Sequence, residues 1–533
     1  MRFKELSEEQ KNVIAEQYRN RINLGLTVEK LAINIGNELG VSERTVRKWF
    51  KKLNLSEKES PEPEQYQKAK EKVFDNTKRK FIITSAQSCT PVNKEFLKNI
   101  EAYAEYIEAE ILVIPFRYKN PTSVFTNEQQ ENEWWDPKIV KYLTLNRHDL
   151  NNGVSILSDV PIQPTASNPL LGLEGMTKDH SCVIGHPRFE LKTIPVMEGC
   201  RPKIMFTSGC CTIPNYTLSK AGKKGEFHHS IGFAIIEIKD EEVFFFRQVG
   251  ANDKNGEFID LFFNVKNGKI SIEDSVEACA MGDIHVAHVD KEVVDVTLND
   301  LFKKLRPKTL FIHDIMDSES ISHHNLKDPF KLHEQEMNGR NSLENEVNEM
   351  LDWLEQIKDY NVYIVKSNHD THIDQFLAST DWRKMTTFKN AIPYMEYSMA
   401  KLKNEAPNGI VPYLINKRFP KFKCLTDDCN VTVKGFIMSA HGHLGASGSR
   451  GGIQQFSRLS TKSVTGHSHT ISRVGGAVSV GTSTHLRVGY NKSFSPWIQA
   501  HGIVNRLGKF QHIVFFNTKD GKEYTTLNDY LKN

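Results

Sequence analysis

The sequence predicts a multidomain α/β protein, and three observations support this class. At 533 residues the chain is too long for one hydrophobic core, so two to four domains are expected. The first 55 residues show helical periodicity, whereas later segments alternate short apolar runs with helical patterns. From residue 276 onward the apolar runs end repeatedly in His or Asp, which is typical of α/β folds that bind ligands at strand ends.

These patterns divide the chain into four segments. We predict a helix-turn-helix-like module at residues 1–55, a charged linker at 56–79, a mixed α/β domain at 80–275 and a further α/β domain at 276–533. The formal net charge of +3 neither demands nor excludes a nucleic-acid partner, because a small basic module can be hidden in a neutral total. No internal repeat of fixed period is detectable.

The composition favours a cytoplasmic protein. The chain opens with charged residues, and no uncharged run of 18 residues follows, so we expect neither a secretion signal nor a membrane span. Eight Cys are too sparse for a disulfide scaffold, which favours a reducing compartment. The sequence leaves open whether the protein forms a homo-oligomer.

The N-terminal module reads as three helices. Ser7 and Gln10 form a capping-box start, and Gly40 and Ser42 mark a turn before the third helix. In that helix the apolar residues recur at the spacing of one buried face, which leaves a basic outer face. Its outward residues are Arg44, Thr45, Arg47, Lys48 and Lys51. A basic recognition helix is how such modules enter the major groove of DNA, although a helical arm for self-assembly or partner docking is the alternative.

The middle of the chain predicts strands, hairpins and one long helix. FIITSA and AEILVIPF read as buried strands around a helix at 94–109, and hairpins are expected around residues 239–241 and 267–268. A single polar helix is expected over about 333–357. We find no motif at 80–275 that carries chemistry by itself.

Histidines concentrate in the last domain, where twelve of the 20 lie between His285 and His469. They form ordered clusters with Asp and Asn, each at or just after an apolar run. The clusters are Asp283-Ile284-His285, His313-Asp314, Asn368-His369-Asp370, His441-Gly442-His443 and Gly466-His467-Ser468-His469. Imidazole and carboxylate ligands suit Mn, Fe and Zn, and a two-metal site needs about seven such ligands. Each cluster alone is compatible with unrelated surface histidines, but five in this order favour a metal centre.

This ordered set resembles the signature of the calcineurin-like metallophosphoesterase superfamily, which runs D-x-H, G-D, G-N-H-D/E, H-G and G-H-x-H. The resemblance covers Asp283 to His469 and implies a sandwich of two sheets flanked by helices. The pattern departs from the family at His313 and Ser367, where the family has Gly.

The resemblance also implies roles for individual residues. Asp283, His285 and His469 would hold the first of two divalent ions, Asp314 would bridge both, and Asn368, His441 and His467 would hold the second. His369 would protonate or stabilise the leaving oxygen, and Asp370 would orient that imidazole. Mn²⁺ is the expected ion, with Mg²⁺, Fe²⁺ or Zn²⁺ as alternatives. We expect phosphate contacts from His323, His443, Arg450 and Arg458, for which an ordinary surface role is the alternative.

The layout as a whole resembles the pre-early nucleases with which tequintavirus-type bacteriophages degrade host DNA. That resemblance implies a metal-dependent DNase, a phosphodiesterase that acts on DNA in the cytoplasm of the infected bacterium. Two rival functions remain at this stage. One is a phosphomonoesterase acting on nucleotides or phosphoproteins, and the other is a DNA-binding regulator without catalytic activity.

Overall fold

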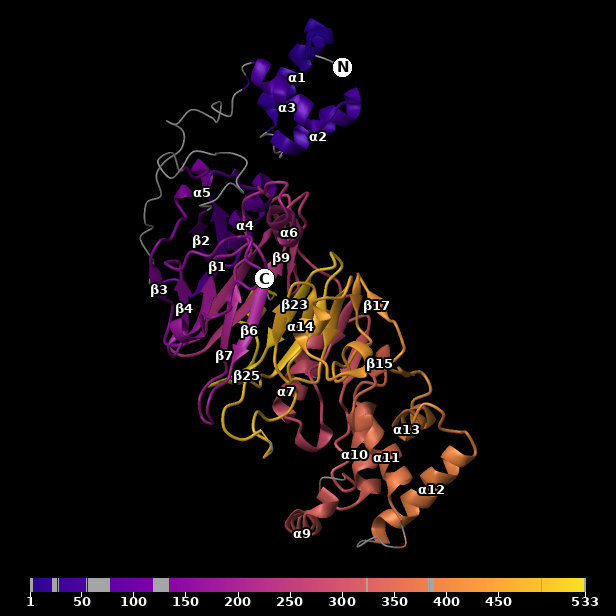
Figure 1. The fold of residues 1–533 in the computed structure, drawn as a ribbon. Coiled ribbons are helices and arrows are strands. Elements are labelled where there is room, and N and C mark those ends of the chain that lie inside the picture. Colours follow the sequence, from indigo (N-terminus) through magenta and orange to yellow (C-terminus); the bar gives the residue numbers. More distant parts are fainter. Residues whose placement is uncertain are drawn as a thin grey trace.

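The computed structural model describes residues 3–21, 26, 28–53, 55, 77–117, 134–322, 325–381, 383, 388–489 and 491–531. The linker expected at 56–79 falls almost wholly outside these residues, as does His323. Figure 1 shows the N-terminal helices at one end of the molecule, the β-strands in the middle and a group of helices at the other end.

Three helices form the N-terminal module, as the sequence predicts: α1 (Glu8–Asn20), α2 (Val28–Leu39) and α3 (Glu43–Lys52). The predicted capping box is present, since the Ser7 side chain accepts from the Gln10 amide and the Gln10 side chain reaches back. The inner face of α3 buries Val46, Trp49 and Phe50 against α1 and α2. This small core fixes which side of α3 stays in solvent.

Three sheets carry most of the remaining fold. The four-stranded sheet has the order β2-β1-β8-β9, with β1 (Lys80–Gln87), β2 (Glu110–Phe116), β8 (Gly232–Ile238) and β9 (Phe244–Gly250). The six-stranded sheet has the order β16-β15-β14-β13-β22-β23, with β13 (Ala278–Ala280), β14 (Leu310–His313), β15 (Val362–Val365), β16 (Lys423–Cys424), β22 (Ala500–Val504) and β23 (Phe510–Val514).

The ten-stranded sheet has the order β17-β18-β19-β21-β20-β6-β7-β5-β4-β3. Its strands are β3 (Arg147–Asp149), β4 (Val154–Leu157), β5 (Ser181–Ile184), β6 (Glu190–Ile194), β7 (Lys203–Thr207), β17 (Thr432–Val433), β18 (Phe436–Ile437), β19 (Lys462–Thr465), β20 (Ser472–Val474) and β21 (Ala477–Ser479). Two small sheets contain β10 (Phe258–Asp260), β11 (Phe263–Lys266) and β12 (Lys269–Ile272), and β24 (Phe516–Thr518) and β25 (Gly521–Glu523).

Helices pack around these sheets. They are α4 (Lys94–Tyr106), α5 (Pro137–Val140), α6 (Lys220–His228), α7 (Lys291–Val296), α8 (Phe302–Leu305), α9 (Pro329–Met337), α10 (Leu343–Glu355), α11 (His372–Ser379), α12 (Ala391–Leu402), α13 (Ile410–Arg418) and α14 (Ile453–Phe456). None of the helices in the described ranges is both long and apolar enough to cross a bilayer. The fold is therefore mixed α/β, with several sheets flanked by helices.

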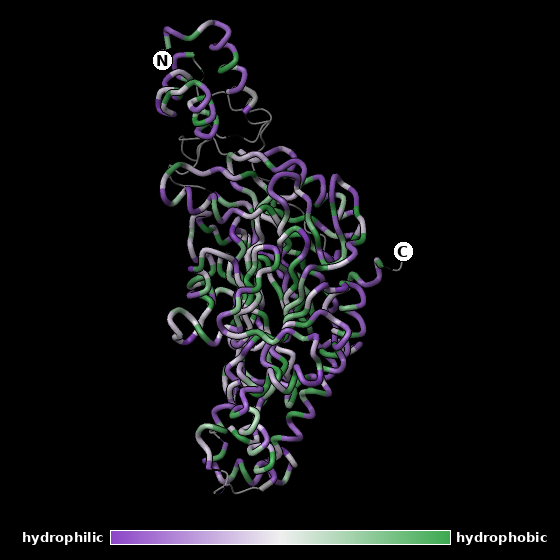
Figure 2. Tube along the Cα trace, turned by 90° about the vertical axis from the view of Figure 1, so that its right-hand side faces the viewer, coloured by the Kyte–Doolittle hydropathy of each residue, from purple (hydrophilic) through white to green (hydrophobic). Residues whose placement is uncertain are grey.

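The sheets form a sandwich because successive side chains of a strand point to opposite faces. Phe81 and Ile83 of β1 pack toward the ten-stranded sheet, in one core with Ile156 and Phe206, whereas Ile82 packs toward the helices. The six-stranded sheet packs on the ten-stranded sheet in the same way, through a core that includes Ala280, Phe311, Val464, Val478 and Phe510. Figure 2 shows hydrophobic segments running through this central part of the molecule.

Several local predictions are confirmed and one is wrong. The hairpins at 239–241 and 267–268 are present, as β8–β9 and β11–β12. The single helix expected over about 333–357 is two helices, α9 and α10. The chain turns between them, where Gly339 has a φ of +69° and Ser342 caps α10. A left-handed glycine ends a helix readily, and this outweighs the continuous polar pattern.

The two halves of the sandwich repeat one topology. In the ten-stranded sheet the order β3-β4-β5-β7-β6 is matched by β17-β18-β19-β21-β20, with the same parallel and antiparallel pairings. In the other layer, β2-β1-β8-β9 is matched by β14-β13-β22-β23. The halves meet where β6 pairs antiparallel with β20, an arrangement of approximate two-fold symmetry. The division into domains at residue 275 stays a prediction, although strands from both sides of it share the ten-stranded sheet.

A buried ion network joins the first half to the C-terminal end of the chain. The Arg247 guanidinium lies 2.6 Å from a Glu237 carboxylate oxygen and 2.7 Å from one of Asp260, and all three side chains are almost completely buried. The Tyr103 hydroxyl donates to Asp260 at 2.8 Å, and the Thr525 hydroxyl donates to Glu237 at 2.9 Å. These contacts compensate the cost of burying the charges.

Removal of the central cation should therefore destabilise the fold. We expect Arg247→Ala to lower the free energy of unfolding by about 3–5 kcal/mol, because Glu237 and Asp260 are then buried without a counter-charge. Urea denaturation measures the change, and Lys358→Ala, which removes an exposed cation, serves as the control. Equal stability of Arg247→Ala and wild type would contradict a structural role for the network.

Candidate metal centre

The parallel strands β13, β14 and β15 bring three of the clusters to one edge of the six-stranded sheet. Asp283 follows β13, Asp314 follows β14 and His369 follows β15. The segments that follow β13 and β14 stay side by side beyond the strands, since the His285 amide donates to the Asp314 carbonyl at 2.8 Å. The carboxyl ends of parallel strands meet at the same edge of a sheet, which explains why these residues converge.

The ten-stranded sheet supplies the other side of the site. His441 follows β18, and His467 and His469 follow β19, which is parallel to β18. The His467 amide donates to the Asp283 carboxylate at 2.7 Å, so the two sheets are joined at the site itself. The site therefore lies where loops from the two layers of the sandwich meet.

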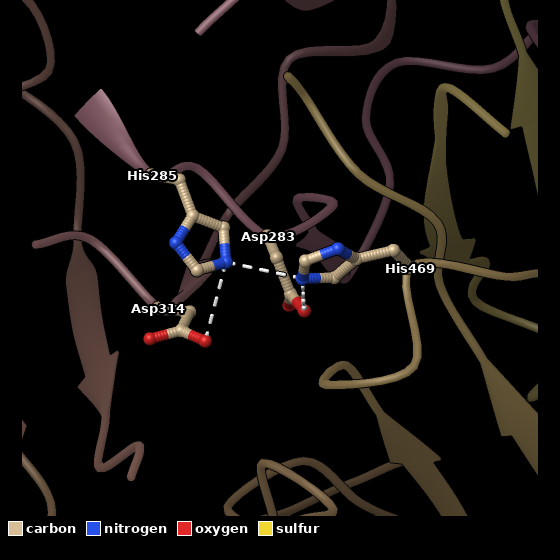
Figure 3. Close-up of side chains that lie close together, drawn as sticks. All are labelled: Asp283, His285, Asp314 and His469. Carbon is tan, nitrogen blue, oxygen red and sulfur yellow. Dashed lines mark hydrogen bonds and ion pairs between the residues drawn. The ribbon is translucent and has the colours of Figure 1, made fainter. Parts of the chain in front are cut away.

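Four side chains form the tightest group, drawn in Figure 3: Asp283, His285, Asp314 and His469. His285 Nε2 lies 3.0 Å from His469 Nε2 and 3.3 Å from an Asp314 carboxylate oxygen. His469 Nε2 lies 3.1 Å from an Asp283 carboxylate oxygen. One potential ligand atom from each residue thus converges on one point, and these are the four residues that the family resemblance assigns to the first metal and the bridge.

Two further groups extend this cluster. Asp283, His313 and His441 form one of them, and His441 Nε2 also lies 3.4 Å from an Asp314 oxygen. His285, Asp317 and His369 form the other. Because the groups share Asp283 and His285, they make up one continuous centre.

The backbone is strained where the ligands lie. His285, Asp314, His467 and His469 have φ values of 44°, 50°, 69° and 55°, in the left-handed region that residues with a Cβ rarely adopt. Gly466 is required beside them, since an added Cβ would lie 2.2 Å from an Asp283 oxygen. Such strain is maintained at sites whose side-chain directions matter.

The electrostatics of the centre indicate a need for positive charge. Burial opposes ionisation of Asp283, yet His441 and His469 lower the pKa of this carboxyl to about 2. Burial likewise opposes a charged His285, yet Asp314 and Asp317 raise the pKa of that imidazole to about 10. The carboxylates thus stabilise whatever cation lies between them.

Unpaired polar atoms support the same conclusion. Buried atoms without a hydrogen-bond partner cluster here: Asp283 Oδ1, Asp314 Oδ1, Asn368 Oδ1, His369 Nδ1, His441 Nε2 and His469 Nδ1. Buried polar atoms are almost always paired, and carboxylate, amide and imidazole donors are ligands of divalent metals. The residues present therefore fit a buried metal centre.

The remaining predicted site residues lie at different distances from this centre. The His443 ring lies 5.4 Å from that of His441, whereas Arg450 and Arg458 are exposed in the loop between β18 and β19. The Asp370 carboxylate accepts from the Ser367 amide at 2.8 Å. In the described part of the chain it makes no hydrogen bond with His369, so the contact that was expected to orient this imidazole is absent.

Two residues of the centre were missed by sequence reasoning. Asp317 hydrogen-bonds His285 Nδ1 at 2.8 Å, and a carboxylate in this position orients a ligand imidazole. His313 was placed in a cluster with Asp314 but was given no ligand role, because the family has Gly at this position, yet its ring lies 5.7 Å from that of His441. The short spacing in His313-Asp314-Ile315-Met316-Asp317 was the available signal for both.

The fold and the site together define a mixed α/β protein with a buried centre of carboxylates and imidazoles that could bind metal. The chain is 31% identical over 467 residues to Protein A1 of Escherichia phage T5, and the alignment covers 83% of this chain and 82% of that protein. The chain therefore belongs to the family of phage T5 Protein A1. No protein-family profile and no solved structure match the chain.

Divalent metal should stabilise the folded protein through this centre. We expect Mn²⁺ to raise the melting temperature by several degrees and EDTA to reverse the rise, because an ion that binds only the folded state shifts the unfolding equilibrium. Asp314→Asn should abolish the effect, whereas Asp359→Asn, at an exposed position, should preserve it. Differential scanning fluorimetry measures both. An equal Mn²⁺ response in wild type and Asp314→Asn would rule out this centre as the binding site.

Proposed function

We propose that the chain is a metal-dependent DNase with a calcineurin-like catalytic half. One observation carries the proposal: two buried carboxylates at adjacent strand ends, Asp283 and Asp314, face histidines that arrive from the opposite sheet. The order of the clusters along the chain and the packing of two sheets with flanking helices both agree with the calcineurin-like pattern.

The residues of the centre divide into holding and reacting groups. Asp283, His285, Asp314 and His469 would hold one ion, with Asn368, His441 and His467 beside a second. Divalent ions in such a centre supply positive charge to the phosphoryl oxygens and lower the pKa of a water molecule. Mn²⁺ suits this mixture of imidazole and oxygen ligands.

His369 is the candidate proton donor. Its ring lies 4.9 Å from that of His285 and 4.7 Å from that of His372, at the edge of the cluster. From there it would donate a proton to the leaving oxygen of a cleaved phosphodiester. His443, which lies 3.9 Å from Asp427, would contact a neighbouring phosphate.

DNA is the substrate that the N-terminal module favours. The outer face of α3 exposes Arg44, Arg47, Lys48 and Lys51, while Thr45 is half-buried and hydrogen-bonds Ser42 at 2.9 Å. We propose that α1, α2 and α3 act as a helix-turn-helix that delivers DNA to the metal centre. Gly36 supports the tight turn, since a Cβ there would lie 2.7 Å from the Val41 carbonyl oxygen.

The family supports a proposal for the biological setting. Protein A1 belongs to a bacteriophage, and a phage DNase of this layout would degrade host DNA in the cytoplasm of the infected bacterium. Protection of phage DNA would then depend on timing or on a partner.

Cleavage of supercoiled plasmid in Mn²⁺ tests the activity. We expect wild type to nick or degrade the plasmid, and His369→Ala and Asp314→Asn to lose at least about 100-fold, the scale expected when a proton donor or a bridging ligand is removed. His333→Ala removes an exposed imidazole and should retain full activity. Hydrolysis of p-nitrophenyl phosphate without cleavage of DNA would favour a phosphomonoesterase and overturn the proposal.

Salt-dependent DNA affinity tests the N-terminal module. We expect Arg44→Ala and Lys48→Ala each to weaken binding of a DNA duplex and to reduce the slope of log K against log salt by about 0.9, because each removes one phosphate contact. Lys4→Ala, at an exposed position of the same module, should leave the slope unchanged. Fluorescence anisotropy measures the slope. Unchanged slopes in both α3 variants would assign the module to another partner.

A further inference from the structure

The repeated topology gives the metal centre a counterpart in the first half. The Ser85 amide donates to the Gly209 carbonyl at 3.1 Å, as the Asp283 amide donates to the Gly481 carbonyl at 3.1 Å. The loop after β5 matches the loop after β19 in the same way: Ser208 donates to Ile184 at 3.0 Å, and Val480 donates to Thr465 at 2.8 Å. Ser85 thus occupies the position of Asp283.

The ligand positions of this counterpart have changed. Residues 185–188 read Gly-His-Pro-Arg where residues 466–469 read Gly-His-Ser-His, so Arg188 occupies the position of His469. His186 is retained, but its Nδ1 accepts from the Arg188 amide at 3.0 Å. Within the described residues of the first half, no group of metal ligands assembles. The first half thus carries a cationic side chain, Arg188, where the second half carries a potential metal ligand, His469.

Arg188 extends across the boundary between the halves. A Cβ added at Gly475, in the turn between β20 and β21, would lie 3.1 Å from its guanidinium. There the two halves enclose a cavity of about 500 Å³, large enough for a small ligand. It lies beside the β6–β20 pairing, where the first half of the chain meets the second.

Four cations line this cavity, one from the first half and three from the second: Arg188, Lys462, Arg473 and Lys509. Among the residues that the structure describes, two carboxylates lie within ion-pair distance of these cations. Asp253 lies 4.0 Å from Lys509, and Glu190 lies 3.2 Å from Arg188. Among the described residues, neither Lys462 nor Arg473 has a carboxylate within ion-pair distance, so the cavity has an excess of positive charge.

Aromatic rings lie under the two uncompensated cations. The Arg473 guanidinium lies 4.6 Å above the ring of Phe189, and its Nε is buried without a hydrogen-bond partner. The Lys462 ammonium lies 5.0 Å above the ring of Phe436. The rings hold the charged groups in the cavity and leave N–H donors for an anion. Phe227, which lines the same cavity, is 83% exposed and offers a surface on which a base can stack.

We propose that this cavity binds the phosphate group of a nucleotide, with Arg188, Lys462, Arg473 and Lys509 as its donors. The nucleotide is either free or part of a DNA strand. The site is separate from the metal centre, because Lys462 begins β19 whereas His467 and His469 follow its other end. The proposal does not depend on the proposed DNase activity.

The charge state of the cavity agrees with an anionic ligand. Burial lowers the pKa of the Lys462 ammonium, and the neighbouring Lys509 and Arg473 lower it further. Burial also lowers the pKa of Arg473 to about 10. A bound phosphate would relieve this repulsion, since a nearby opposite charge favours the charged form.

Isothermal titration calorimetry of the full-length protein in EDTA tests the site with three probes: inorganic phosphate, dAMP and a short single-stranded oligonucleotide. We expect wild type to bind at least one of them, and Arg473→Gln and Lys462→Met to bind about tenfold or more weakly, because each loses a charge-assisted hydrogen bond. Lys421→Ala, at an exposed position, is the matched control. Asp314→Asn should bind as wild type does, which separates this site from the metal centre.

The same variants report on folding. Without ligand, Arg473→Gln and Lys462→Met should melt at or above the wild-type temperature, because each removes a cation from a repulsive cluster. Binding of dAMP that is weakened in these variants identifies a free nucleotide as the ligand, whereas binding of the oligonucleotide alone identifies a DNA strand. Equal affinities in wild type and both variants, or no binding of any probe, would overturn the proposal.

Discussion

The burial of two carboxylates side by side is the constraint on which the second half of the fold depends. Asp283 and Asp314 follow adjacent parallel strands, so the sheet itself holds two buried carboxylates close together. Such an arrangement is stable only if cations neutralise it. The histidines of the second sheet face these carboxylates, and the left-handed backbone at His467 and His469 directs them there. The site can therefore form only when the two layers of the sandwich pack together, because each layer contributes part of it.

The two halves share one strand topology, but their matching loops carry different side chains. In the second half, the loop after β19 contributes His467 and His469 to the metal centre. In the first half, the matching loop after β5 contributes Arg188 to a cavity shared by both halves. The repeated topology therefore contains a candidate metal centre in the second half and a cavity lined by cations at the boundary between the halves.

The centre could be predicted from the sequence because its His and Asp residues directly follow short apolar runs. An apolar run followed by His or Asp identifies a strand end, and parallel strands bring such ends together. Asp317 and the role of His313 were missed, since both act through contacts that only the folded loops create. The long helix expected over 333–357 failed at Gly339, whose backbone conformation outweighed the polar pattern. The repeated topology could not be detected from the sequence, because Ser85 and Arg188 share no chemistry with Asp283 and His469, and helices α9 to α13 interrupt the second half.

The pairing of β6 with β20 also has a consequence for biosynthesis. When β6 leaves the ribosome, its open edge has no neighbour until residues 472–474 have been translated, a delay on the order of tens of seconds at usual elongation rates. An uncovered strand edge is a template for aggregation, and charged side chains are the usual protection. β6 contains the charged residues Glu190 and Lys192. These charges should protect the open edge of β6 from aggregation until β20 has been synthesised and pairs with it.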